Sequence, residues 1–263
     1  MSLRSASPHA SPARPIAPGF TLIELLTVIA IIGILAAIVI PTVGTVREKA
    51  QRAVDASNLR EIIKAAQLHA SEHGDRLPDP RMVPPSALTS ANPALLWPGI
   101  LARRGHLTDP SFWFSKIDPH FDGRFPSAIL DPEDASQRSL DAGFARQPLA
   151  WEFAGGLRLG DPATMPVAWT RGLQANGTWS ATSGVYRDLG GFIGFLGGNV
   201  AFFSGTGTGP EDGILTSNNS GRRTQNILQA VPTNAMVYGI PPAGSIASAV
   251  VGQPGGTMAI RGP

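Results

Sequence analysis

Residues 20–40 form a continuous apolar stretch near the start of the chain, interrupted by a single charge at Glu24. A helix needs about 20 apolar residues to cross the hydrocarbon core of a bilayer, and this stretch has that length. Nearly every side of such a helix would be apolar, whereas a surface helix of a soluble protein keeps a polar face. A cleaved secretory signal has a shorter apolar region and a small-residue cleavage site, but Pro41 follows this one. The pattern therefore predicts a membrane-spanning helix over residues 20–40.

Beyond Pro41 the helical pattern continues to about residue 73. Apolar and small residues recur mostly every three or four positions, which predicts one apolar stripe on an otherwise charged helix. Gly74, followed by Pro78, is a typical stop signal. We therefore expect residues 41–78 to hold the rest of the helix and a linker. The predicted stripe consists of Val43, Val46, Ala50, Ala53, Val54, Ser57, Ile62, Ala66 and Ala70.

The remaining sequence predicts a small body of short strands and many loops over residues 79–240. Glycine (30 residues) and proline (24 residues) are frequent and only 15% of residues are charged, yet 43% are hydrophobic, which is enough for a packed core. Residues 150–153 and 166–170 suit short strands. Residues 241–263 are rich in Gly, Ala and Pro, and we expect a flexible tail there. The predicted fold class is α+β: a long N-terminal helix, membrane-spanning in its first half, packed on a loop-rich antiparallel β body.

The clearest local signal in the body is a hairpin over residues 191–203, where two apolar runs flank Gly197 and Gly198. Two glycines permit the positive φ angles that a two-residue hairpin turn requires. With that turn, four side chains would share one face and form two cross-strand pairs. The predicted pairs are Phe195 with Val200 and Ile193 with Phe202.

Glu24 requires an explanation, because a charge inside an apolar helix is costly. The cost is on the order of 2.5 to 3.5 kcal/mol at the centre of a spanning helix and less near its end. No Lys or Arg lies within one helical turn of Glu24. We therefore expect its partner to come from another chain or from a newly made chain terminus.

The string GFTLIE at residues 19–24 resembles the processing site shared by type IV pilins and type II secretion pseudopilins. Pro41 also falls where that family commonly has a proline. The hairpin segment resembles the terminal hairpin of planctomycete- and verrucomicrobial-type pilin-like proteins. Those proteins often carry Leu-Asp-Gly-His-Val, whereas residues 196–200 of this chain read Leu-Gly-Gly-Asn-Val, so no role of the missing Asp and His transfers.

The resemblance implies that a prepilin peptidase cuts between Gly19 and Phe20 and then N-methylates Phe20, so that residues 1–19 form a cleaved leader. Glu24 would then face the new Phe20 amine of a neighbouring subunit, where the two charges offset each other's desolvation. The implied location is the inner membrane, with a single pass and the body in the periplasm or on an extracellular filament.

The function that the resemblance implies is that of a structural subunit of a type II secretion or type IV pilus-like filament, without enzymatic activity. Its partners would be copies of itself, minor pseudopilins and the prepilin peptidase. The alternative is a membrane-anchored periplasmic enzyme or binding module that uses the same signal. A secretion pseudopilin and a pilus subunit both fit the sequence.

Charge and composition narrow the function classes further. The net charge of +2 is too small to favour nucleic-acid binding. Both surplus charges, Arg4 and Arg14, lie in the predicted leader, and the rest of the chain carries 19 basic and 19 acidic residues. The absence of cysteine excludes disulfides, thiol catalysis and cysteine-based zinc sites.

Two short motifs suggest metal chemistry. Asp118, His120 and Asp122 partly imitate a calcium loop, but the twelfth position is Ile129 rather than Glu. We expect no resident cofactor, and calcium at these three residues is the alternative. A second motif has the spacing of an inverted zinc-peptidase site, for which the polar end of a helix is the favoured interpretation. Its residues are His69, Glu72 and His73.

Overall fold

The computed structural model describes residues 20–84, 86–90, 92–209, 211–239, 250–251 and 259–260. The predicted leader and most of the predicted tail lie outside the described residues. The chain divides into two compact units, Met1–Arg47 and Glu48–Pro263. The fold is α+β, as the sequence predicts, with one long helix and a body of antiparallel strands.

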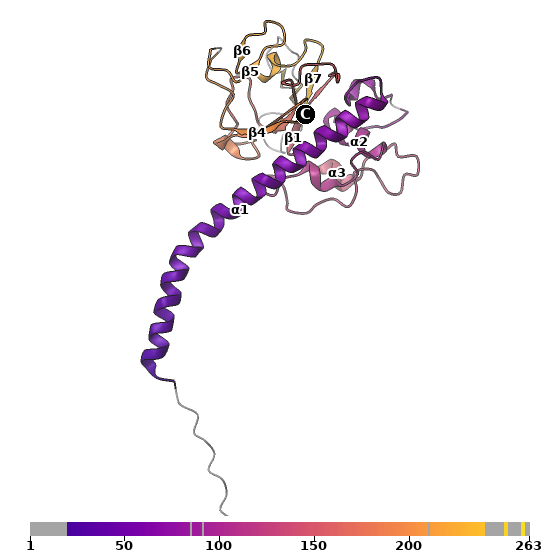
Figure 1. Ribbon diagram of the computed structural model, residues 1–263. Helices are drawn as coiled ribbons and strands as arrows, with labels where there is room; N and C mark the ends of the chain where they lie inside the picture. The colour runs from indigo at the N-terminus through magenta and orange to yellow at the C-terminus, as the bar shows by residue number, and fades with distance from the viewer. Residues whose placement is uncertain are drawn as a thin grey trace, which may run out of the picture. The chain divides into compact units, whose positions relative to one another are not determined.

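The long helix, α1, runs from Leu22 to Glu72 and is continuous through Pro41 (Figure 1). Its end confirms the stop signal, because Gly74 takes the left-handed conformation with φ of +63°. The N–H of Asp75 then donates to the carbonyl of Ala70 at 2.9 Å, which satisfies one of the last free carbonyls of the helix.

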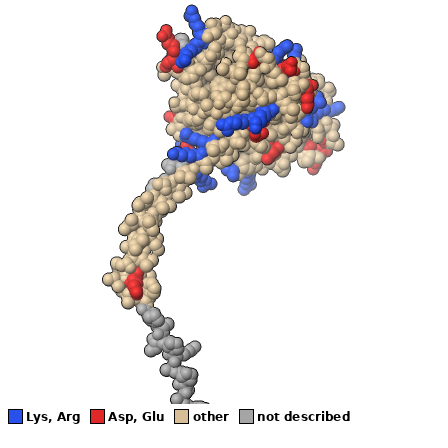
Figure 2. Space-filling view, viewed as in Figure 1, with Lys and Arg blue, Asp and Glu red and all other residues tan. Residues whose placement is uncertain are grey.

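The first unit presents the apolar half of α1 with its large side chains exposed. In the view of Figure 2 this half is almost entirely free of basic side chains. The segment is long and apolar enough to cross a membrane. The exposed large apolar residues here are Phe20, Leu22, Ile23, Leu25, Leu26, Val28, Ile29, Ile31, Ile32, Ile34, Leu35, Ile38, Val39, Ile40, Val43 and Val46.

The buried face of α1 in the second unit begins at Asp55 and includes only part of the predicted stripe. Ile62, Ala66 and Ala70 are buried, whereas the earlier members of the stripe are exposed. At 3.6 residues per turn, Val54 does not share a face with Leu59, so the early spacing follows a different side of the helix. The buried residues of α1 are Asp55, Ala56, Leu59, Ile62, Ile63, Ala65, Ala66, His69 and Ala70.

The body contains one five-stranded antiparallel sheet with the order β4-β3-β2-β1-β7. Two of these strands confirm the segments that the sequence predicts, and both are buried along their whole length. The strands are β1 Trp151–Gly155, β2 Pro166–Thr170, β3 Gly191–Phe195, β4 Val200–Phe203 and β7 Met236–Tyr238.

Short helices and loops cover the sheet. Three 3₁₀ helices begin with Asp or Asn followed by Pro, and in each the Asp or Asn side chain accepts the N–H two residues on. The helices are Pro80–Met82, Pro93–Leu95, α2 Leu96–Arg103, Pro110–Trp113, α3 Ala142–Arg146, Arg187–Leu189 and Ile227–Gln229. The small sheets are β5 Leu215–Thr216 with β6 Arg223–Thr224, and β8 Val250–Val251 with β9 Ala259–Ile260.

Strands β3 and β4 form the predicted hairpin, but in a register that differs from the prediction by one residue. Gly194 lies opposite Val200, and Phe192 lies opposite Phe202. The pairs that the sequence predicts incorrectly are Phe195 with Val200 and Ile193 with Phe202.

The turn explains the difference in register. Gly198 has φ of +84°, and its N–H donates to the carbonyl of Phe195 at 2.8 Å, whereas Gly197 does not take a positive φ. The connection is therefore a β-turn followed by one left-handed residue, which is a three-residue loop instead of a two-residue one. Because side chains alternate between faces, this change moves every side chain of β4 to the other face relative to β3.

Strand β3 packs closely on the second half of α1. A Cβ atom at position 194 would collide with the Cδ1 atom of Ile63 and lie 3.1 Å from the Cγ atom of Leu59. Glycine at this position therefore permits the close approach of strand and helix. On the same face of the sheet, the ring of Phe202 lies under the guanidinium of Arg52, 4.4 Å from the ring centroid.

Candidate functional site

The start of α1 carries the predicted processing and assembly residues. Gly19 lies outside the described residues, and Phe20 is 76% exposed next to the first helical turn. The carboxylate of Glu24 accepts hydrogen bonds from the backbone N–H of Thr21 at 2.8 Å and from its hydroxyl at 2.6 Å. In return, the Glu24 N–H donates to Oγ1 of Thr21 at 3.3 Å. This reciprocal arrangement is a capping box.

The capping box gives Glu24 a local partner that the charge argument missed. The signal is in the sequence, because Thr21 and Glu24 have the Thr-x-x-Glu spacing of a capping box. Thr21 supplies hydrogen bonds but no positive charge. Among the described residues, no ion pair to Glu24 is present, so the negative charge itself is not neutralised within the described chain.

An exposed apolar helix of this length must be covered by lipid tails or by other apolar surfaces, because large apolar patches in water are unfavourable. The arrangement at this end of the chain is thus an apolar shaft that begins with one capped carboxylate. It can insert into a membrane and pack against similar helices.

Comparison with known proteins identifies this region. Residues 17–40 match the prokaryotic N-terminal methylation motif, and they include Gly19, Phe20 and Glu24. The chain thus carries a signal of the type IV pilin kind on a single N-terminal apolar helix. A signal of this kind implies a substrate of a prepilin peptidase and a membrane-associated filament. No curated protein and no solved structure matches the chain, so the predicted likeness to planctomycete- and verrucomicrobial-type proteins stays a prediction.

The residues considered for calcium do not converge. Asp118 forms a buried ion pair with Arg171, whose Nη2 atom lies 2.8 and 2.9 Å from the two carboxylate oxygens. His120 Nε2 lies 2.7 Å from the carbonyl of Thr182, and Asp122 Oδ1 accepts the N–H of Arg124. Within the described parts of the chain, no group of three His, Cys, Asp or Glu residues is arranged to hold a metal ion.

The residues of the zinc-peptidase-like motif, His69, Glu72 and His73, also do not converge on one point. The rings of His69 and His73 stack in parallel with centroids 4.0 Å apart, while Oε2 of Glu72 lies 3.3 Å from Nε2 of His106. Burial, followed by electrostatic interaction with His73, His106 and Arg104, lowers the pKa of His69 to about 4. At neutral pH the His69 ring is therefore uncharged.

The body also buries charged groups that the sequence reasoning missed. Asp55 on α1 accepts hydrogen bonds from Ser115 Oγ at 2.5 Å and from the hydroxyl of Tyr186, and burial raises its pKa. These bonds link the helix to two loops. The sequence does show an acidic residue, Asp55, among the positions of the buried face of the helix. It does not show which groups bind that residue, because Ser115 and Tyr186 lie 60 and 131 residues away.

Glu152 on β1 is another buried acid, with 3% of its surface exposed. Its carboxylate accepts the indole N–H of Trp169 at 2.7 Å and the N–H of Gly172 at 3.3 Å. Burial raises the pKa of Glu152 to about 7. These hydrogen bonds join β1 to β2 and to the turn that follows β2, so the geometry supports a role in the fold.

Proposed function

We propose that this chain is a structural subunit of a pilin-like filament, either a type II secretion pseudopilin or a type IV pilus subunit. It is processed after Gly19 and assembled through the apolar half of α1. The observation that carries this proposal is the methylation motif placed at the start of an exposed apolar helix. The proposal assigns the body a structural role, not an enzymatic one.

The helix supports this function in three ways. Its apolar length holds the precursor in the inner membrane with the body on the outer side. In the filament, the same surface packs against the helices of neighbouring subunits. Glu24 then pairs with the Phe20 amine of a neighbouring subunit. This ion pair neutralises the carboxylate, which within its own chain receives hydrogen bonds from Thr21 but no positive charge.

Intact-mass measurement of the protein from its host tests the proposal. We expect the loss of residues 1–19 and one added methyl group on Phe20. A Gly19→Leu variant should retain the leader, since a side chain at the cleavage position obstructs the peptidase. An unprocessed leader on the wild-type protein in the membrane fraction would contradict the proposed function.

A further inference from the structure

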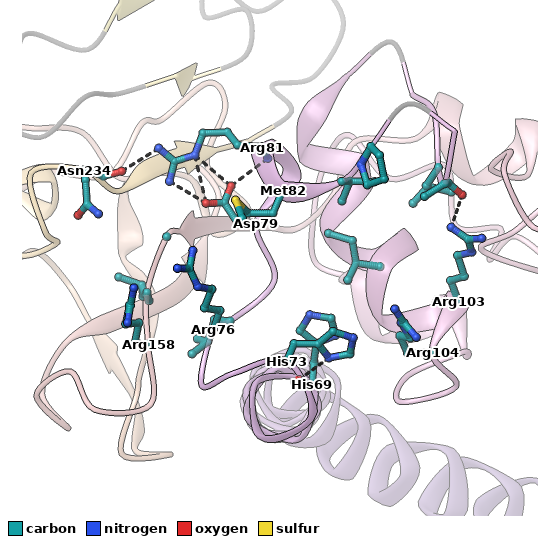
Figure 3. A pocket seen from close by; sticks show the side chains of 18 residues that line it. His69, His73, Arg76, Asp79, Arg81, Met82, Arg103, Arg104, Arg158 and Asn234 are labelled. Carbon is teal, nitrogen blue, oxygen red and sulfur yellow. Dashed lines mark hydrogen bonds and ion pairs between the residues drawn. The ribbon is translucent and has the colours of Figure 1, made fainter.

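A cavity of about 600 Å³ opens at the far end of α1, away from the processing site along the sequence. Its walls come from the last turns of α1, from the segment after the helix, from α2 and from the loop that follows β1 (Figure 3). All its lining residues belong to the second unit. A volume of this size suits a small organic ligand.

The cavity has a strong excess of positive charge. Five arginines line it, namely Arg76, Arg81, Arg103, Arg104 and Arg158, whereas Asp79 is the sole acid among the described residues of the lining. That carboxylate is already used, because Arg81 binds it through Nη2 at 2.7 Å and the hydroxyl of Tyr238 donates to it at 3.1 Å.

Three of the arginines have guanidinium groups that stay available. Among the described residues, Arg76, Arg104 and Arg158 form no side-chain hydrogen bond or ion pair, whereas Arg103 donates to the carbonyl of Ala87. Figure 3 shows Arg76 and Arg158 together on one side of the cavity and Arg104 on the other, with His69 and His73 between them.

Two of these arginines lie directly opposite each other on paired backbone segments. Arg76 and Arg158 form an antiparallel bridge, supported by the hydrogen bond from the Leu77 N–H to the carbonyl of Leu157 at 3.0 Å. Like charges directly opposite each other on paired strands destabilise a fold. An anion held between them would remove that repulsion and form paired, charge-assisted hydrogen bonds with the planar guanidinium groups.

The lining also includes apolar residues. Leu77, Leu88, Ile100 and Leu157 are buried residues that reach the cavity wall. Met82 is 62% exposed beside them. Met82, Val83 and Ala87 keep apolar surface exposed in the lining. Free energy is gained when the apolar part of a ligand covers that surface, and inorganic anions have no such part.

We propose that this cavity binds a small organic anion, with a carboxylate or phosphate group held by Arg76, Arg158 and Arg104 and an apolar part lying on Met82, Val83 and Ala87. This site is separate from filament assembly through the N-terminal helix, and it gives the body a binding role that the proposed function does not include.

The test is isothermal titration of the full chain in a neutral detergent with four probes. Phenyl phosphate and benzoate carry both features, inorganic phosphate carries only the charge, and phenol carries only the ring. We expect one of the two aromatic anions to bind with one-to-one stoichiometry, about tenfold or more tightly than inorganic phosphate or phenol. Whichever aromatic anion binds more tightly identifies the preferred acidic group.

Variants assign the binding to the cavity. Arg104→Glu and Arg76→Glu should each weaken binding by about tenfold or more, because each replaces an attractive charge with a repulsive one. Arg222→Glu makes the same charge change at an exposed arginine outside the cavity and should leave the dissociation constant within about twofold. A cooperative thermal unfolding transition in each of the three variants shows that they fold.

Three results would overturn the proposal. They are no binding of either aromatic anion at millimolar concentration, binding of phenol as tight as that of the anions, and equal weakening by Arg222→Glu. Because the test uses no processing or assembly readout, its failure leaves the proposed filament function untouched.

Discussion

At the scale of single residues, the body stabilises buried charges with several polar partners each. Arg171 is the clearest example, since its guanidinium donates to the carbonyls of Ser183 and Leu149 as well as to Asp118. A buried charge that lost these partners would destabilise the fold by several kcal/mol. The carboxylate of Asp118 therefore serves the fold here, and a calcium ion there would have to displace Arg171.

Glu152 gives the body a pH-dependent stability. Its pKa is about 7 in the folded chain, against an ordinary value of 4.5. Between these values the folded state keeps a proton that the unfolded state has lost, so the free energy of unfolding falls as pH rises. The contribution is up to about 1.4 kcal/mol per pH unit and is complete above pH 7. We expect Glu152→Gln to remove this part of the slope.

Thermal and urea unfolding of the full chain between pH 4.5 and 8, followed by tryptophan fluorescence, measures this effect. His69 contributes with the opposite sign between pH 4 and 6.5, because its pKa is lowered on folding, but it is present in both proteins and cancels in the comparison. Glu133→Gln, at an exposed acid, is the matched control and should keep the wild-type slope. Equal slopes for wild type and Glu152→Gln would refute the prediction.

The sequence revealed residue roles only where the partners are near in the chain. The Thr21–Glu24 capping box could be read from a spacing of three residues. By contrast, Asp118 and Arg171 are 53 residues apart, and neither carries a local pattern that indicates the pair. The guanidinium groups around the cavity share this property, since the turn after α1 and the loop after β1 must fold before Arg76 meets Arg158.

At the scale of elements, the apolar periodicity and the stop signals predicted which helices and strands form better than they predicted how the strands pair. The apolar run and Gly74 define α1 to within two residues of its ends. The hairpin was predicted, but its register depends on whether one or both glycines are left-handed, and the dipeptide Gly197-Gly198 allows both. The packing of one element on another was more difficult to predict from the sequence than strand pairing. Gly194 has no side chain whose apolar character would indicate that β3 packs on α1.

That contact leads to a prediction for Gly194→Val. The new side chain must occupy space filled by Ile63 and Leu59, both fully buried. Overpacking of this kind costs about 1 to 3 kcal/mol. Gly160→Val is the matched control, since nothing lies within 4 Å of a Cβ atom there, and it should change stability by about 0.5 kcal/mol or less.

Urea unfolding of the two variants measures the difference, and a double variant makes the test specific. Ile63→Ala alone creates a cavity, but combined with Gly194→Val it also makes room for the valine. We therefore expect the double variant to lose less stability than the sum of the single losses. Additive losses would show that Gly194 does not face Ile63.

At the scale of the whole molecule, the apolar unit and the body can be observed independently. All five tryptophans, Trp97, Trp113, Trp151, Trp169 and Trp179, belong to the second unit. Their fluorescence therefore reports the body and not the apolar half of α1. A change at the start of the helix should alter assembly while leaving the fluorescence transition of the body unchanged.

Glu24 has two candidate roles at this scale, and two substitutions separate them. Glutamine can replace glutamate in a capping box, so Glu24→Gln keeps the helix start but removes the negative charge. Thr21→Ala keeps the charge but removes the cap, at a cost of about 1 kcal/mol to the helix. If the carboxylate pairs with the amine of a neighbouring subunit, Glu24→Gln should lose most filament assembly, whereas Thr21→Ala should retain it.

Filament yield in the sheared fraction, compared with the amount of processed protein in the membrane, provides the measurement. Both variants should insert into the membrane and show the wild-type fluorescence transition, which excludes a folding defect in the body. Normal filaments from Glu24→Gln together with few from Thr21→Ala would assign Glu24 to the helix cap alone. Few filaments from Glu24→Gln together with normal filaments from Thr21→Ala would assign the charge of Glu24 to a contact with a second subunit. Within its own chain, the helix cap requires only an acceptor oxygen at this position, which glutamine also supplies.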